Sequence, residues 1–260
     1  MKISQKFKIR ASAGGKLMTE SKGKTNRELY DEAVESLNKL KFRYSEFKNK
    51  DCKSAVDIVN KKIPEQEVLI SELEKIKDKI ELSETTKTFL QEWVKEIIYN
   101  VKKDIKNKYL TKGLTLEDTA IDKAIEWLDL PFAIKNEQFF EDDYFMGTPD
   151  LIVDGVVYDT KCSWDCFTFP LFSDDIPNKD YYYQLQIYMH LTGMKKACLV
   201  YILLNTPENL PSWEEKKNYD NLDKKYKIKT FEFNYDPEVI EKLKQKVIES
   251  RNYIKTLNYE

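Results

Sequence analysis

The sequence predicts an α/β fold in which helices flank a mixed central sheet. Apolar residues recur at helical spacing in residues 116–128 and again in 181–193. Between these segments, an Asp-Gly pair joins two β-rich runs within residues 148–161, the pattern of a two-residue β-hairpin. A further apolar run, residues 196–205, follows the second helix. Strands and helices that alternate in this way are typical of a sheet covered by helices.

Length and composition limit the class of protein. The chain has 260 residues, of which 41% are apolar, enough to bury the core of one large domain. No stretch approaches the roughly 18 uninterrupted apolar residues of a membrane span, and the opening segment lacks the apolar core of a signal peptide. We therefore expect a cytoplasmic protein with no membrane partner. The four cysteines favour free thiols. With a net charge of −2, any site for a polyanion must be a local patch.

The first half of the chain is predicted to be helical. Residues 27–109 are rich in Lys and Glu, with apolar residues at helical spacing. Helix starts are expected near Pro64 and after Ser83, and Gly113 is expected to end the block. The charges indicate a solvated face, although residues 101–113 concentrate lysines where a phosphate backbone could lie.

The second half carries the predicted core. Residues 1–110 are interpreted as an N-terminal segment with a helical elaboration, and residues 111–260 as a core that ends in a strand and a helix. The predicted elements of this core are a helix at 116–128, a strand at 132–140, the hairpin at 148–161, a helix at 181–193, strands at 196–205 and 226–235, and a helix from Asp236.

The hairpin brings acidic residues together. If Asp154 and Gly155 form the loop, Asp150 faces Asp159 across the two strands. Opposed residues have Cβ atoms about 5 Å apart, where two like charges are unfavourable unless a cation lies between them. The hairpin therefore predicts either a divalent cation site or a hairpin end with solvated charges.

Strand alternation adds detail to the metal interpretation. Lys161 lies on the face of Asp159, while the Thr160 side chain is expected to point away and leave its carbonyl as an additional oxygen ligand. Carboxylate and carbonyl oxygens suit Mg²⁺ or Mn²⁺ and not zinc.

Polar residues also lie on the predicted helices. In the first of these helices, the apolar residues Ile121, Ala124 and Leu128 form a stripe that is predicted to be buried. Glu117 lies on the same stripe, one turn before Ile121, and a carboxylate on a buried face needs a partner. Gln184 and Tyr188 are four residues apart on one face of the later helix. Both can also be ordinary half-buried polar residues.

Together these residues resemble the motifs of the PD-(D/E)XK nuclease superfamily. Gln184 to Tyr188 resembles the QxxxY motif of its RecB-like branch, and the chain is most similar there to phage recombination exonucleases of the lambda-exonuclease and YqaJ type. The resemblance covers residues 7–19 and 111–204, and residues 20–110 have no counterpart. The residues that carry it are Ser12 in the opening motif, Glu117, Pro149-Asp150, Asp159-Thr160-Lys161, Gln184 and Tyr188. One departure is the aspartate at position 159, where close relatives often carry glutamate.

The resemblance implies a restriction-endonuclease-like αβββαβ core and a metal site. Asp150, Asp159 and the Thr160 carbonyl would hold Mg²⁺, with Mn²⁺ able to substitute, and Glu117 would bind directly or through water. Lys161 would orient the attacking water and balance charge on the phosphate. A lysine beside carboxylates keeps its proton, which favours electrostatic stabilisation over a general-base role.

Further implied roles concern the substrate. Gln184 and Tyr188 would position Lys161 or the scissile backbone, Arg10 and Ser12 would grip a terminal 5′-phosphate, and Trp164 would stack on bases. Some RecB-like nucleases carry an iron-sulfur cluster, but their C-terminal cysteine triplet is missing here. We expect no cluster.

The predicted function is a Mg²⁺-dependent DNA exonuclease that digests duplex DNA from the 5′ end in phage-type recombination or repair. An endonuclease of the same superfamily, restriction-like or acting on branched DNA, is the alternative among enzymes. A non-catalytic nucleic-acid or protein-binding module is the alternative from another class. The helical block at residues 20–110 could in any of these cases be a docking surface for an annealing protein or for self-assembly into a homo-oligomer.

Overall fold

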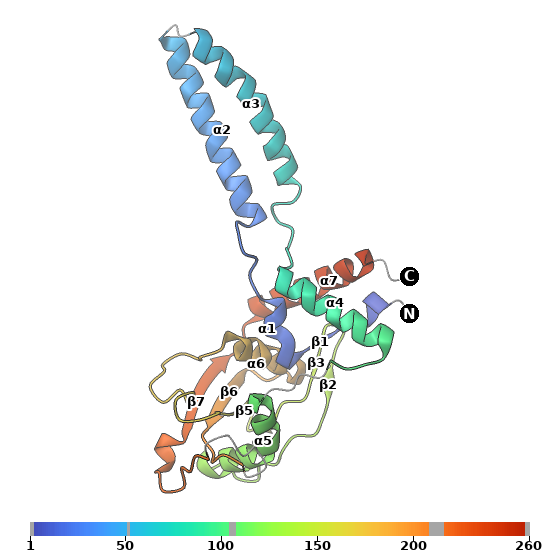
Figure 1. Cartoon of the computed structure of the whole chain (residues 1–260), viewed down its shortest axis with the longest axis vertical. Helices are drawn as coiled ribbons and strands as arrows, with labels where there is room; N and C mark the ends of the chain where they lie inside the picture. The colour runs from blue at the N-terminus through green and yellow to red at the C-terminus, as the bar shows by residue number, and fades with distance from the viewer. Residues whose placement is uncertain (1–2, 51–52, 104–107, 208–215, 258–260) are drawn as a thin grey trace. The chain divides into compact units, whose positions relative to one another are not determined.

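The computed structural model describes residues 3–50, 53–103, 108–207 and 216–257 (Figure 1). The chain forms two compact units. One comprises Met1–Thr19 with Thr85–Glu260, and the other comprises Glu20–Glu84. In the part of the chain that is described, no helix combines the length and the apolar character needed to cross a bilayer.

The larger unit is built on a four-stranded mixed sheet in the order β4-β5-β6-β7. β5 pairs antiparallel with β4 and parallel with β6, and β6 pairs antiparallel with β7. The mixed α/β class predicted from the sequence is therefore confirmed. These strands span Leu151–Val153 (β4), Val156–Cys162 (β5), Lys196–Ile202 (β6) and Ile228–Asn234 (β7).

Helices cover both faces of this sheet. α5 (Lys108–Trp127) packs Ala120 and Ala124 against Cys198 and Val200 of β6. α6 (Lys179–Thr192) is the crossover between the parallel strands β5 and β6 and contacts both. Since side chains alternate along a strand, residues next to those facing α5 point toward α6. This alternation directs Asp159 and Lys161 toward α6.

A smaller sheet joins the N-terminal segment to the middle of the chain. β1 (Ile9–Arg10) pairs parallel with β3 (Phe145–Gly147), and β3 pairs antiparallel with β2 (Phe140–Glu141). The predicted strand at 132–140 is reduced to its last residue, since residues 132–139 are irregular. The remaining elements of this unit are the 3₁₀ turns Ile3–Lys6 (η1), Ala11–Ala13 (η2) and Lys224–Tyr226 (η3), and the helices Gly14–Leu17 (α1), Glu84–Tyr99 (α4) and Pro237–Thr256 (α7).

α6 is tied to the end of β7 by the residues of its other face. Gln186 donates to the Asn234 carbonyl and accepts from the Asp236 amide, both at 2.8 Å. His190 lies 3.1 Å from both Asp142 Oδ2 and Tyr235 Oη. Asp236 caps α7, as predicted. These contacts hold α6 in a single orientation over the sheet.

The smaller unit is a helical hairpin of α2 (Asn26–Asn49) and α3 (Lys53–Glu74), which lie side by side (Figure 1). Thr25 and Glu28 form a capping box at the start of α2. Half-buried apolar residues repeat every three or four positions along the facing sides of both helices, a coiled-coil seam in which Ala33 and Val59 are the buried residues. We name this element the helical arm.

Three predicted boundaries in the helical first half have different outcomes. α4 begins after Ser83, as expected. Pro64 lies inside α3 and not at a helix start, and because its position is exposed, water can satisfy the carbonyl that loses its partner. Gly113 does not end the helical block, since it lies within α5.

Candidate active site

Asp159 is the centre of a buried polar network in the middle of β5. Its side chain is 2% exposed. Asp159 Oδ1 accepts a hydrogen bond of 2.9 Å from Gln184 Nε2, and Asp159 Oδ2 lies 2.5 Å from Lys161 Nζ. Gln184 Nε2 also donates to Tyr188 Oη at 3.1 Å. The structure therefore brings together four of the residues that the sequence singled out, from one strand and one helix.

The spacing of α6 explains why Gln184 and Tyr188 meet at Asp159. Residues four apart on a helix share a face, and this face of α6 packs on the sheet, where both side chains are buried. Burial, with the charge of Asp159, raises the pKa of Tyr188. Tyr188 thus keeps its proton and presents a neutral hydroxyl to the network.

Asp150 reaches the cluster at the break between the two sheets. It precedes β4 and lies outside the paired residues, which begin with Leu151 opposite Tyr158. Its Oδ2 accepts hydrogen bonds from Thr160 N at 2.6 Å and Thr160 Oγ1 at 2.7 Å. Thr160 alternates with Asp159 and Lys161 along β5 and pairs with Val200 on the α5 side of the sheet, so its side chain points away from theirs, as predicted, and its hydroxyl is bound by Asp150. The predicted two-residue turn sets the register, with Leu151 opposite Tyr158 and Val153 opposite Val156, but the predicted pairing of Asp150 with Asp159 is not part of the ladder.

The charges of the cluster shift one another's ionisation. Burial, with the charges of Asp150 and Glu117, raises the pKa of Asp159 to about 6, although Lys161 opposes the shift. Burial lowers the pKa of Lys161, but the charges of Asp159 and Asp150 outweigh burial and raise it overall. Lys161 therefore stays protonated, whereas burial disfavours the ionised form of the neighbouring Asp159 carboxylate.

The donor atoms of this cluster fit a divalent cation. Asp159 Oδ2 is buried and, although it is ion-paired with Lys161, accepts no well-directed hydrogen bond among the described residues. Both hydrogen bonds from Thr160 to Asp150 end on Oδ2. The amide and carbonyl of one strand residue point to the same side, so the Thr160 carbonyl faces the edge where Asp150 lies. These oxygens are the donor type that Mg²⁺ and Mn²⁺ prefer.

Glu117 is not brought into this donor set. Its Oε1 forms an ion pair of 2.9 Å with Lys135 Nζ, which also lies 2.7 Å from Asp118 Oδ1. Among the described residues, no three His, Cys, Asp or Glu side chains converge to hold a metal. Glu117 acts on Asp159 only through its charge. The Glu117 side chain is 44% exposed, so its predicted place on a buried face is wrong. Its partner Lys135 lies in the irregular segment, where no motif could have identified it.

Structural comparison identifies the architecture around this cluster. A phage-related exonuclease from Haemophilus somnus 129PT is 24% identical, with a TM-score of 0.69, and the match covers 96% of this chain and 95% of that one. An alkaline exonuclease from Laribacter hongkongensis, LHK-Exo, matches at 16% identity and a TM-score of 0.51, over 68% of this chain and 86% of its own. Its complex with dAMP matches at 18% identity and a TM-score of 0.50, over 67% and 84%.

The chain has the fold of these exonucleases. No protein-family model matches the sequence, and a search of the curated proteins finds no significant match. The structural likeness to the exonuclease fold spans nearly the full length of the first of these neighbours.

The N-terminal segment of the exonuclease fold packs beside Tyr188. A Cβ atom on Gly147 would lie 2.8 Å from Tyr188 Cε1 and 3.1 Å from the Cβ of Ala11, so the three residues are in close contact. Arg10, in β1, is close enough for its charge to act on the Tyr188 hydroxyl. Arg10 and Ser12 are both exposed. The structure thus places Arg10 near the cluster, and the side chains of Arg10 and Ser12 are both accessible to a ligand.

The loop after β5 carries the remaining predicted residue. Trp164 is half-buried, and its carbonyl accepts a hydrogen bond of 2.7 Å from Lys112 Nζ, which also donates to the Leu204 carbonyl at 3.0 Å. Lys112 is 1% exposed, and burial lowers its pKa. It belongs to the lysine-rich stretch that was predicted to be a solvated face, with a phosphate contact as the alternative, and both interpretations are wrong for this residue because Lys112 is buried and anchors the loop.

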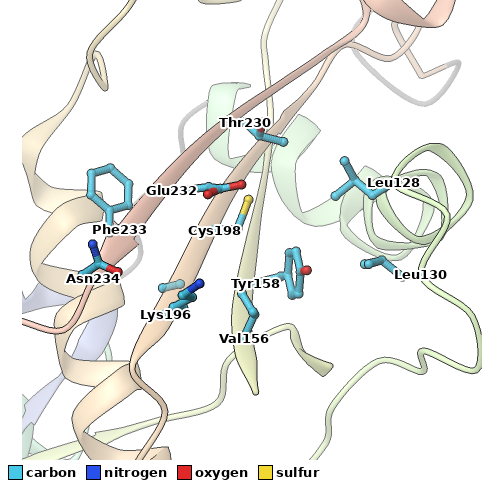
Figure 2. Close-up of a pocket in the computed structure, with 11 residues that line it drawn as sticks. Leu128, Leu130, Val156, Tyr158, Lys196, Cys198, Thr230, Glu232, Phe233 and Asn234 are labelled. Carbon is cyan, nitrogen blue, oxygen red and sulfur yellow. The ribbon is translucent and has the colours of Figure 1, made fainter. Parts of the chain in front are cut away.

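A separate hollow of about 630 Å³ lies on the α5 side of the sheet (Figure 2). Cys198 and Glu232 lie close together there, with Tyr158 below them (Figure 2). Burial and the charge of Glu232 raise the pKa of Cys198 to about 12. None of the predicted site residues lines this hollow.

Proposed function

We propose that this protein is a metal-dependent DNA exonuclease that hydrolyses phosphodiester bonds of duplex DNA in the 5′→3′ direction. The observation that carries the proposal is the Asp159 network, with Lys161 and Gln184 on one carboxylate, built on an exonuclease fold. The dAMP bound by LHK-Exo is a mononucleotide, the kind of product that stepwise digestion of a DNA end releases. This likeness supports DNA as the substrate.

The metal site would use oxygens of three residues. Asp150, Asp159 and the Thr160 carbonyl would hold Mg²⁺, or Mn²⁺ in its place, with Glu117 acting through water. When bound, such an ion activates a water molecule and offsets the charge that develops on the phosphate. Glu117 reaches this role only if its ion pair with Lys135 opens.

Two groups would serve the reaction from the protein side. Lys161 keeps its proton, because its pKa is raised, and so supplies positive charge to the phosphate. Gln184 holds the Asp159 carboxylate in place and is itself oriented by Tyr188. Residues that orient a metal ligand commonly contribute ~10–100-fold to metal affinity or activity.

The direction in which the DNA strand is digested would be set by the N-terminal segment. Arg10 and Ser12 would bind the terminal 5′-phosphate, since a guanidinium and a hydroxyl suit phosphate oxygens. The exposure of both side chains, and the charge of Arg10 near Tyr188, support this role. Trp164 would contact the DNA end through the loop that Lys112 anchors.

The test uses linear duplex DNA with a 5′-phosphate and covalently closed plasmid, each with Mg²⁺ or with EDTA. We expect the wild type to degrade only the linear DNA, and only with Mg²⁺. Lys161→Ala and Asp159→Asn should abolish degradation, while Lys242→Ala, at an exposed residue of α7, should not. Labels at the 5′ and 3′ ends report the direction.

Each other result has a definite meaning. Cutting of the closed plasmid would replace the exonuclease by an endonuclease of the same fold. Release of the 3′ label first would overturn the polarity and the roles of Arg10 and Ser12. Retained activity of Lys161→Ala and Asp159→Asn would overturn the site.

A further inference from the structure

The helical arm has a strongly uneven charge distribution along its length. Its distal half, residues 37–50 and 53–63, carries eight Lys or Arg and two Asp or Glu. Its proximal half, residues 25–36 and 64–76, carries two Lys or Arg and eight Asp or Glu. For a chain with a net charge of −2, this is a concentrated basic patch of the local kind that a polyanion site requires.

Among the residues that the structure describes, the cations nearest the end of the arm have no acidic partner. At the start of the distal half, Lys39 forms an ion pair with Glu35 at 2.6 Å and Lys41 forms one with Glu67 at 3.0 Å. Further toward the end, six cations are exposed and form no ion pair within the described ranges: Arg43, Lys48, Lys50, Lys53, Lys61 and Lys62. We name these six the tip cations.

The tip cations do not serve the stability of the arm as a group. Lys48 and Lys50 lie at the end of α2, where the helix dipole favours positive charge. Arg43, Lys61 and Lys62 lie inside the helices, away from such ends. Like charges that are clustered on a helical surface repel and are mildly destabilising. A ligand that supplies negative charge would relieve this repulsion.

We propose that the tip of the helical arm is a second nucleic-acid contact, which binds the phosphate backbone of duplex DNA through the tip cations. The choice of DNA rests on the proposed function. Long, exposed Lys and Arg side chains without acidic partners are the groups that neutralise phosphates and release counterions. Contacts to phosphates do not distinguish one base from another, so this contact is independent of the DNA sequence.

The acidic proximal half limits the contact to the tip. Eight carboxylates along residues 25–36 and 64–76 repel a phosphate backbone. DNA is therefore held at the end of the arm and not along its side. Phe42, 65% exposed among these cations, adds an apolar surface at the same end.

The experiment measures binding of a fluorescent 40-base-pair duplex to the full chain in EDTA, so that no hydrolysis occurs, at several salt concentrations. The test variant combines Arg43→Gln, Lys61→Gln and Lys62→Gln. We expect its Kd to rise roughly tenfold or more, and the slope of log K against log salt to fall by about 2 to 3. Two duplexes of unrelated sequence should respond alike.

The matched control combines Lys24→Gln, Arg27→Gln and Lys75→Gln, which removes the same charge at the opposite end of the arm, from the start of α2 and from the residues just outside the two helices. We expect its binding to equal that of the wild type. Helical content by circular dichroism should match for all three proteins. Equal affinities and salt slopes for the two variants would overturn the proposal.

Two further outcomes are informative. If the tip variant alters sedimentation without DNA, the tip is a contact between copies of this chain, and the proposal is wrong. Because binding is measured without hydrolysis, an inactive enzyme whose tip variant still loses DNA affinity would overturn the proposed function and leave this inference standing.

Discussion

The side-chain amide of Gln184 donates to Asp159 Oδ1 over 2.9 Å, and the same nitrogen donates to Tyr188 Oη. One side chain of α6 thus fixes the orientation of a buried carboxylate on β5. We expect Gln184→Ala to lower the metal-dependent activity by ~10–100-fold, because Asp159 loses this hydrogen bond. The Mg²⁺ concentration for half-maximal activity should rise.

Gln186→Ala is the control for this change. Gln186 lies on the same helix but bonds to Asn234 and Asp236 at the end of β7. Its substitution should lower the melting temperature without changing the Mg²⁺ requirement. An equal change in Mg²⁺ requirement for both variants would contradict a specific role for Gln184.

Gly147→Ala should disturb the site through packing. The added Cβ would lie 2.8 Å from Tyr188 Cε1 and 3.1 Å from Ala11 Cβ. We expect a loss of about 1–3 kcal/mol in the free energy of unfolding, measured in urea, together with lower activity as Tyr188 is displaced. Gly113→Ala is the matched control, since its Cβ meets nothing within 4 Å and it lies in α5. That change should stabilise by about 0.5–1 kcal/mol. Unchanged stability of Gly147→Ala would refute the close packing.

Lys112→Met should destabilise the protein. Methionine retains much of the volume but leaves the carbonyls of Trp164 and Leu204 without this donor. We expect a loss of about 1–3 kcal/mol in urea unfolding. Lys102→Met, at an exposed position, should change stability by less than about 0.5 kcal/mol. Equal effects at the two positions would show that the buried contacts do not contribute.

Metal binding should depend on pH through Asp159. Its pKa of about 6 lies above the ordinary 3.8. The folded protein therefore binds a proton more tightly than the unfolded chain, and this group's contribution to metal-free stability is lost as pH rises from about 4 to 6. A cation needs the ionised form, so apparent affinity falls about tenfold for each pH unit below 6.

Thermal unfolding with Mn²⁺ or EDTA, at pH 5.0 and 7.5, measures this effect. The increase in Tm with Mn²⁺ should be larger at pH 7.5, and Asp159→Asn should show no increase at either pH. An increase of the same size at both pH values would mean that Asp159 is not the titrating ligand.

The cysteines should differ in reactivity. Cys198 is 5% exposed with a pKa of about 12, so its thiolate fraction at pH 8 is about one in ten thousand. Cys166 is exposed. Iodoacetamide should modify Cys166 within minutes and leave Cys198 unmodified until urea is added, as peptide mass spectrometry would report. Rapid labelling of Cys198 in the native protein would show that the sheet opens there.

The parts that could be predicted depend on local chemistry. Asp154 and Gly155 both have positive φ, 48° and 78°, as the two-residue turn requires, and this turn set the register of the hairpin. The helical face of Gln184 and Tyr188 followed from spacing alone. In each case, the determining residues are within a few positions of one another.

The parts that were missed depend on distant partners. β1 and β3 have two and three residues, too few for any periodicity, and β1 forms only because Ile9 meets Phe145. The ion pair of Glu117 with Lys135 joins a helix to an irregular segment. The position of the Asp150 carboxylate depends on the break between two sheets, which no local pattern marks.

The parallel pairing of Ile9 with Phe145 has a consequence for how the chain is made. At a synthesis rate of ~5–20 residues per second, the first strand waits roughly 7–27 seconds for its partner to emerge from the ribosome. The helical arm is complete by Glu74 and forms from local contacts during that wait. β1 therefore pairs with β3 only after the helical arm has folded. Arg10 and Ser12, which are proposed to bind the terminal phosphate, reach their final positions late in folding.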